Sequence, residues 1–167
     1  MKIFVTSDHG GFEFKNAIYE HLFHHGYDVE DVGPQTLDPH DDYPEYVFKM
    51  TTKILGSVDK DPRGIVAAGS GQGEAIAANR ASGIRAAVFY GPVQAKRAVD
   101  VTGRKSTDPY EILRLSREHN NTNVLSLGGR FLTDEEAIKA VDMWLKEPFP
   151  GHERHKRRLE KIEKLYG

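Results

Sequence analysis

The chain has 167 residues, 38% of them hydrophobic and 29% charged, with a formal net charge of −2 and no cysteine. This length fits one domain with a single apolar core, and the charge gives no general attraction to nucleic acid or to an anionic membrane. The lack of cysteine excludes disulfides, thiolate metal ligands and a thiol nucleophile. Because no apolar run approaches the roughly 20 residues of a membrane span, we expect a cytoplasmic protein.

Short apolar, β-branched runs alternate along the chain with stretches of helical period. The predicted strands are residues 3–7, 27–32, 64–68, 84–90 and 124–127. Strands that alternate with helices form parallel sheets with right-handed crossovers and helices on both faces. The sequence therefore predicts an α/β fold: a Rossmann-like, doubly wound parallel sheet of about five strands, in a single domain over residues 1–167.

Helix boundaries are marked by local signals. An apolar stripe over residues 14–22 leads to Gly26, which is placed as a C-cap glycine. Pro44 suits the first turn of a second helix. Thr133 and Glu136 have the spacing of a capping box ahead of another amphipathic helix.

Charged residues and glycines follow four of the five predicted strands, at residues 7–11, 69–74, 90–92 and 128–130. Doubly wound sheets bind ligands outside the carboxyl ends of their strands. We therefore expect Asp8, His9, Glu74 and Arg130 to gather at one edge of the sheet. Glycine after a strand is also common simply because the chain must turn, so each loop alone would be weak evidence.

The sequence GSGQGE at residues 69–74 follows a strand and precedes the helical EAIAANRA. Its backbone N–H groups should lie at a helix N-terminus, where they form a cradle for an oxyanion or a phosphate. A dinucleotide fingerprint would have a third glycine at Glu74, and a P-loop would end in Gly-Lys-Ser/Thr. We therefore expect neither a nicotinamide cofactor nor ATP.

Two roles are open for Glu74. The helix dipole favours an ordinary acid in a first turn. A carboxylate beside a row of N–H donors can also take a proton from a carbon next to a carbonyl, while the donors hold the developing enediolate oxygen. This pairing suits an aldose–ketose isomerisation, which requires no metal and no redox cofactor, and the chain shows no clear ligand cluster for either.

The last predicted helix, about residues 152–165, carries Arg154 and Arg158 one turn apart on one face. Two guanidinium groups on a rigid face suit a phosphate, although composition alone favours a solvated basic face balanced by Glu153, Glu160 and Glu163. The run HKRR is short and flanked by glutamates, so nucleic-acid binding is not expected. His119, in SREHNNTN before the fifth strand, fits an ordinary helix end.

The sequence resembles the type B ribose-5-phosphate isomerases and their galactose-6-phosphate isomerase relatives. The resemblance lies in GSGQGEAIAAN together with SDHGGFEFK, SREHNNTNVLSLGGR and the terminal ERHKRR, in this order over most of the chain. It implies metal-free interconversion of phosphorylated aldose and ketose, most simply ribose 5-phosphate and ribulose 5-phosphate. It also implies a homodimer with sites built from both subunits, with a tetramer left open, and a C-terminal helix docked at the subunit interface.

The resemblance also implies a role for individual residues. Glu74 matches the proton-abstracting base, and His119 matches the acid that assists ring opening. Ala68 stands where one branch of the family has a cysteine base, so the chain resembles the glutamate branch. The substrate contacts fall on the first loop, the anion hole and the polar or basic positions: Asp8, His9, Gly69, Ser70, Gly71, Gln72, Gly73, Asn120, Arg130, Arg154 and Arg158.

The segment over residues 95–115 is longer than the corresponding part of typical family members. Asp108 and Pro109 look like the N-cap and first turn of a helix, which predicts a helix interrupted around residues 102–107. Because this segment leaves the binding edge, it can reshape the pocket, and pentose, tetrose and hexose phosphates all remain open as substrates. A non-catalytic sensor of a phosphorylated metabolite is the alternative from another class.

The position of His119 has a topological consequence. A residue that precedes the fifth strand lies at the amino end of a parallel sheet, whereas Glu74 lies at the carboxyl end. His119 can therefore serve the site of Glu74 only across an interface, so a monomer would be incomplete and a two-fold dimer would hold two equivalent sites.

Overall fold

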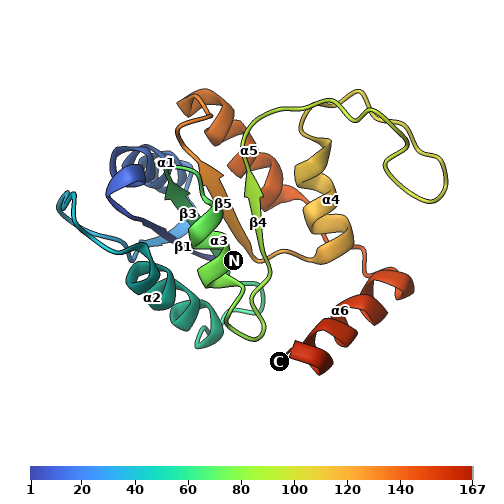
Figure 1. Ribbon diagram of the computed structural model, residues 1–167, viewed down its shortest axis with the longest axis horizontal. Coiled ribbons are helices and arrows are strands. Elements are labelled where there is room, and N and C mark those ends of the chain that lie inside the picture. Colours follow the sequence, from blue (N-terminus) through green and yellow to red (C-terminus); the bar gives the residue numbers. More distant parts are fainter. Residues whose placement is uncertain (167) are drawn as a thin grey trace.

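The computed structural model describes residues 1–166, and its core is one parallel sheet (Figure 1). The strands are β1 (Lys2–Ser7), β2 (Asp28–Asp31), β3 (Arg63–Ala68), β4 (Ala86–Phe89) and β5 (Val124–Gly128). They lie in the order β2-β1-β3-β5-β4, and every neighbouring pair is parallel. The predicted α/β fold is confirmed.

Helices cover both faces of the sheet. They are the 3-10 turn η1 (His9–Gly11) and the α-helices α1 (Phe12–His24), α2 (Tyr43–Leu55), α3 (Gln72–Ala78), α4 (Glu111–Asn120), α5 (Asp134–Lys146) and α6 (Glu153–Tyr166). Helices α1 and α5 pack together on one face, and α2 and α3 pack together on the other. Helix α4 contacts α5 and α6. None of the helices within residues 1–166 is long and apolar enough to cross a membrane.

Strand β3 shows how the sequence fills both sides of the sheet. Its successive side chains alternate: Ile65 and Ala67 belong to the core under α1 and α5, whereas Val66 and Ala68 belong to the core under α2 and α3. A central parallel strand is buried on both faces, so it reads as a continuous apolar run. Trp144 of α5 is fully buried in the first of these cores.

The predicted helix signals are found in the structure. Gly26 follows the last turn of α1 with φ 77°, a left-handed conformation that glycine adopts without steric cost. Pro44 lies in the first turn of α2. The capping box is complete, because Glu136 N donates to Thr133 Oγ1 at 3.2 Å and Thr133 N donates to Glu136 Oε2 at 3.0 Å.

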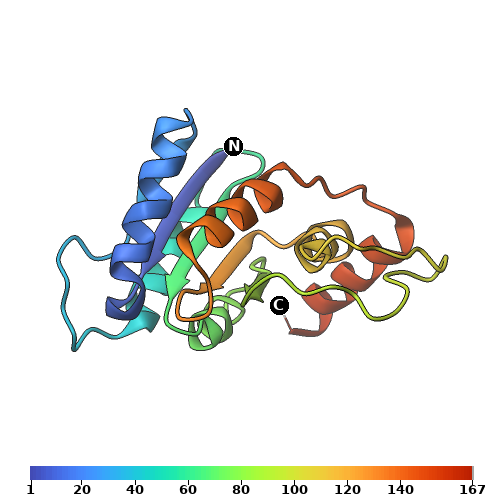
Figure 2. The same ribbon diagram turned by 90° about the horizontal axis from the view of Figure 1, so that it is seen from above.

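The prediction of an interrupted helix after β4 is correct in part: residues 102–107 are not helical and a helix, α4, follows them, but the part before the interruption is wrong, because all of residues 91–110 form a loop. Asp100 accepts hydrogen bonds from Thr102 N at 2.8 Å and Thr102 Oγ1 at 2.6 Å, and Gly103 has φ 85°. Such side-chain bonds to a neighbouring backbone compete with helix formation. Asp108 accepts from a backbone N–H two residues on, so it closes a turn ahead of the helix rather than capping it. Figure 2 shows this loop extending beside α6.

Gly11 makes the tightest contact between the first loop and the sheet, so a substitution at this residue tests the fold. A Cβ on Gly11 would stand 2.0 Å from Ala67 O and 2.6 Å from Ala68 N. Gly11→Ala should therefore lower the free energy of unfolding by about 3 kcal/mol, because backbone must move to admit the methyl group. Urea denaturation measures this loss. The control is Gly26→Asn, with open space and a left-handed φ that Asn tolerates, which should cost less than about 1 kcal/mol. Equal urea midpoints for Gly11→Ala and Gly26→Asn would contradict the close packing of Gly11 against β3.

Candidate active site

The loops that follow β1, β3 and β5 meet at the carboxyl edge of the sheet. Arg130 N donates to Gly69 O at 3.1 Å, and a Cβ on Gly69 would lie 3.2 Å from Arg130 Nε. A Cβ on Gly10 would lie 3.3 Å from Asp8 Oδ1 and 3.5 Å from Gly69 N. The expected gathering of these loops is therefore observed, with Gly10 and Arg130 both next to Gly69 of the glycine loop.

The glycine loop between β3 and α3 has little room around it. Gly71 has φ 73° and is the N-cap of α3, and its carbonyl accepts a hydrogen bond from Ser126 Oγ at 2.8 Å. A Cβ on Gly73 would lie 2.7 Å from the ring of Tyr43. The loop is therefore clamped between β5 and α2, which fixes the direction of its backbone N–H groups. Gln72 N donates to Ser70 Oγ at 3.4 Å within the same loop.

Glu74 lies in the first turn of α3 and is only 5% exposed. Burial raises the pKa of its carboxyl group; the N–H of its own backbone lowers this pKa, and the negative charge of Asp8 raises it. Glu45, in the first turn of α2, is an exposed acid of the ordinary kind. The contrast favours a chemical role for Glu74 over a simple interaction with the helix dipole.

His9 is held by a residue that the sequence did not single out. His9 Nδ1 lies 2.7 Å from Asp41 Oδ1, and the backbone N–H of His9 donates to the same oxygen at 3.0 Å. The hydrogen bond to Asp41 raises the pKa of His9, and the charge of Asp8 adds to this rise. A ring that is more readily protonated suits contact with an anion. The Asp-rich run beside His40 reads as a solvated loop, and only the folded chain brings Asp41 to His9.

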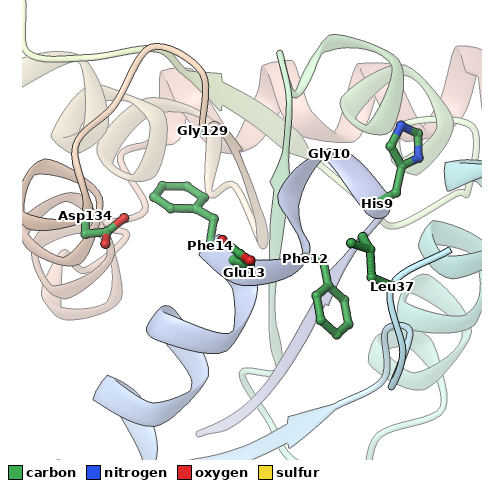
Figure 3. Close-up of a pocket in the computed structure, with 8 residues that line it drawn as sticks. All are labelled: His9, Gly10, Phe12, Glu13, Phe14, Leu37, Gly129 and Asp134. Atoms are coloured by element: carbon green, nitrogen blue, oxygen red, sulfur yellow. The ribbon is translucent and has the colours of Figure 1, made fainter. Parts of the chain in front are cut away.

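A cavity of about 360 Å³ opens beside His9 on this edge (Figure 3). Its lining comes from the first loop, from the start of α1, and from the chain beyond β2 and β5: His9, Gly10, Phe12, Glu13, Phe14, Leu37, Gly129 and Asp134. Glu74 is not in this lining. The cavity is therefore bounded by the loops after β1 and β5 rather than by the glycine loop or its carboxylate. Residues 1–166 contain no group of three or more His, Asp or Glu side chains placed to hold a metal ion.

A second group of predicted site residues lies where α4 meets α6. His119 is in the last turn of α4, and its ring stacks on that of His155 with centroids 4.3 Å apart and planes 12° apart. A cavity of about 280 Å³ is lined by His119, Arg154, His155 and Arg158, with the loop residues 98–101 as its opposite wall. Burial lowers the pKa of His119. The structure thus brings His119, Arg154 and Arg158 to one cavity.

Asn120 is placed apart from its neighbour His119. It lines a different cavity of about 590 Å³, whose other walls come from the chain between α3 and β4 and from β4, α4 and α6. Sequence adjacency does not bring the two side chains to one site, because consecutive residues of a helix point in directions about 100° apart.

Within one chain the two groups remain separate. Glu74 follows β3 and so belongs to the carboxyl edge, whereas His119 precedes β5 and belongs to the amino end. The linings of the 360 Å³ and 280 Å³ cavities have no residue in common. This arrangement agrees with the topological expectation that one chain does not unite the two groups.

Fold and geometry together define a doubly wound α/β protein whose candidate ligand site lies at the carboxyl ends of its strands. The family model for ribose/galactose isomerases matches residues 3–103 and 107–162. The chain belongs to this family, as the resemblance in its motifs indicates.

Individual relatives support the same assignment. A probable ribose-5-phosphate isomerase B of Mycoplasma genitalium is 41% identical over 160 residues, which cover 96% of this chain and 92% of that protein. The ribose-5-phosphate isomerase B of Mycolicibacterium paratuberculosis is 36% identical over 160 residues, covering 96% and 88%.

Solved structures give the same result. The structure of ribose-5-phosphate isomerase B from Clostridium thermocellum matches with TM-score 0.82 and 37% identity, covering 99% of this chain and 97% of that chain. The crystal structure of the Mycoplasma genitalium isomerase with bound ribulose 5-phosphate matches with TM-score 0.82 and 38% identity, covering 98% and 94%.

The contact between His9 and Asp41 can be tested by titration. Asp41→Asn removes the carboxylate that favours the protonated ring, so the pKa of His9 should fall toward that of an ordinary histidine. NMR spectra of the histidine ring protons, recorded across the pH range, measure this value. Asp42→Asn is the matched control, because Asp42 is exposed and adjacent, and it should leave the pKa of His9 much closer to wild type. An equal shift in both variants would contradict the specific pairing.

Proposed function

We propose that this protein is a metal-free aldose–ketose isomerase that interconverts ribose 5-phosphate and ribulose 5-phosphate through an enediolate. The observation that carries the proposal is the buried Glu74 carboxyl group at the start of α3, next to the backbone N–H groups of the glycine loop. Membership of the ribose/galactose isomerase family supports the reaction class. The related isomerase with bound ribulose 5-phosphate supports the substrate.

The proposed reaction begins with ring opening. His119 donates a proton to the ring oxygen of the closed sugar as the bond between that oxygen and C1 breaks, and the proton of the C1 hydroxyl passes to solvent water as the aldehyde forms. The lowered pKa of His119 makes its protonated ring a stronger acid than an ordinary imidazolium. Opening exposes the carbonyl group that makes the neighbouring C–H acidic.

Glu74 then moves one proton between neighbouring carbons. Its carboxylate takes the proton from C2 of the aldehyde, and the electron pair moves to give an enediolate whose oxygen accepts hydrogen bonds from the N–H groups of residues 70–73. The proton of the C2 hydroxyl then passes to the oxygen on C1, and return of the proton from Glu74 to C1 gives the ketose with its carbonyl group at C2. The raised pKa of Glu74 makes it a stronger base than an exposed glutamate, which brings its basicity nearer to that required.

The phosphate group is assigned to the cavity between α4 and α6. Arg154 and Arg158 lie there with His119, so a bound phosphate would anchor the sugar away from the reacting carbons and orient it. His9, whose pKa is raised by its hydrogen bond to Asp41, is a further residue at the carboxyl edge that can carry positive charge. A phosphorylated sugar carries charge that keeps it inside a cell, which fits a cytoplasmic enzyme.

The proposed enzyme is a homodimer with two shared sites. Glu74 and the glycine loop of one subunit would face His119, Arg154 and Arg158 of the other, with α6 docked at the interface. An isologous two-fold contact would produce two equivalent sites. The separation of the two groups within one chain supports this arrangement.

A different sugar phosphate is the second candidate, and one observation favours it. Residues 98–101 form a wall of the cavity that holds Arg154 and Arg158, and they belong to the long loop between β4 and α4. A wall of this kind can set the length of sugar that fits, so tetrose and hexose phosphates belong in the assay. A panel of aldose phosphates tested for ketose formation by the wild-type protein identifies the substrate. A non-catalytic sensor would bind a sugar phosphate without exchanging its carbon-bound proton with deuterated water.

Glu74→Gln tests the base directly. The amide keeps the size of the side chain but cannot accept the proton, so kcat should fall by roughly 10²- to 10⁴-fold. Affinity for ribose 5-phosphate, measured by calorimetry, should stay within about threefold of wild type because no phosphate contact is removed. The control is Glu45→Gln, which changes an exposed first-turn acid of α2 and should leave kcat unchanged. Full activity in Glu74→Gln would remove the proposed base.

Mixing two inactive variants tests the shared site. In a heterodimer of Glu74→Gln and His119→Ala, one site carries both changes and the other carries neither. Random exchange of subunits should therefore restore about one quarter of wild-type activity, since half of the dimers are mixed and each has one intact site. Native mass spectrometry verifies the exchange. Confirmed heterodimers without recovered activity would show that the two residues do not act together across an interface.

A further inference from the structure

His155 lies at the centre of the cluster where α4 meets α6, although the reaction described above assigns it no role. Its side chain is only 3% exposed, and it is the buried residue of α6. Two residues of the proposed site, His119 and Arg154, contact the side chain of His155. Its ring stacks on that of His119, and its Nε2 atom accepts a hydrogen bond from Arg154 Nε at 3.0 Å.

The bond from Arg154 defines the chemical form of His155. A guanidinium group only donates, so Nε2 of His155 must carry a lone pair and its proton must lie on Nδ1. Burial, followed by the positive charge of His119, of Arg154 and of Arg158, lowers the pKa of His155, which agrees with a neutral ring. The bond also uses the Nε edge of Arg154, so the two Nη groups are those that can pair with phosphate oxygens.

The stack acts on His119 in a different way. His119 ends α4 and His155 begins α6, so contact between the parallel rings joins two helices that are separated by β5 and α5 in the sequence. A flat partner at 4.3 Å leaves the imidazole of His119 few other orientations. The ring of His155 therefore restrains both His119, the proposed acid, and Arg154, which is proposed to bind the phosphate.

We propose that His155 is a positioning residue that couples phosphate binding to ring opening: its Nε2 atom orients Arg154, and its ring fixes the orientation of His119. This inference rests on the function proposed above. A displacement of about 1 Å in a reacting group can cost two orders of magnitude in rate, so the coupling has a measurable consequence.

Two variants separate the two contacts. His155→Phe keeps a flat ring against His119 but removes the acceptor for Arg154, so KM for ribose 5-phosphate should rise by roughly tenfold with kcat within about threefold of wild type. His155→Gln keeps an amide oxygen near the position of Nε2 but removes the ring, so kcat should fall by roughly tenfold with KM within about threefold.

A second assay isolates ring opening. Ribulose 5-phosphate has no free C5 hydroxyl with which to form a furanose, so exchange of its C1 proton in deuterated water needs Glu74 but no ring chemistry. In His155→Gln this exchange should fall by less than about threefold while the conversion of ribose 5-phosphate falls roughly tenfold. A merely structural role would reduce both rates in parallel, and parallel loss would overturn the proposal.

Controls separate this inference from the function on which it rests. Glu74→Gln should lower the rates of both the exchange and the conversion by roughly 10²- to 10⁴-fold, and a wild-type protein that performs neither reaction would contradict the proposed function itself. His24→Gln replaces an exposed histidine of α1 and should leave both rates unchanged. Unaltered kinetics in both His155 variants would overturn the positioning role alone.

NMR of the wild-type protein provides a test that does not depend on how the variants fold. Long-range proton–nitrogen correlation spectra distinguish the two ring nitrogens of each histidine. At neutral pH, His155 should appear as the neutral tautomer with its proton on Nδ1 and an unprotonated Nε2. A proton on Nε2 would exclude the hydrogen bond from Arg154 and overturn the proposal.

Discussion

The common direction of the five strands is the constraint on which the arrangement of the site depends. Because every strand is parallel, the loops that follow β1, β3 and β5 reach the same edge and bring together Asp8, Glu74 and Arg130. Each helix then returns the chain to the opposite end, where α4 places His119. In the proposed enzyme, the need for a second subunit follows from this backbone direction rather than from any particular contact.

Close packing and electrostatics work together at the carboxyl edge. The glycine loop is held between Ser126 and Tyr43, which places α3 so that the carboxyl group of Glu74 is withdrawn from water. Withdrawal from water and the charge of Asp8 both work against ionisation, and a backbone N–H group partly offsets them. In the proposed enzyme, this raised pKa suits the role of Glu74 as a base.

Sequence patterns predict the fold well because they are local. Strand β3 is a continuous apolar run, and the Thr133–Glu136 capping box needs only three residues of spacing. The topological rule for parallel sheets also predicts the edge that carries Glu74. By contrast, the pairing of His9 with Asp41 joins residues 32 apart and leaves no periodic trace in the sequence. The sequence predicts helix on both sides of residues 102–107, and the part before them is absent because Asp100 accepts hydrogen bonds from the backbone N–H groups of Thr102 and Arg104, which outweigh intrinsic helix propensity there.

In the proposed enzyme, the loop over residues 91–110 lies where it can influence the choice of sugar, away from the groups that transfer the proton. Arg104 ties the loop together through Asp100 at 3.2 Å and ties it to α4 through Glu118 at 2.9 Å, the residue next to His119. Residues 98–101 then form a wall of the cavity that contains the two arginines. The base and its N–H donors lie at the other end of the strands, on elements that this loop does not form. Changes in the loop can therefore alter which sugar fits without altering how its proton is moved.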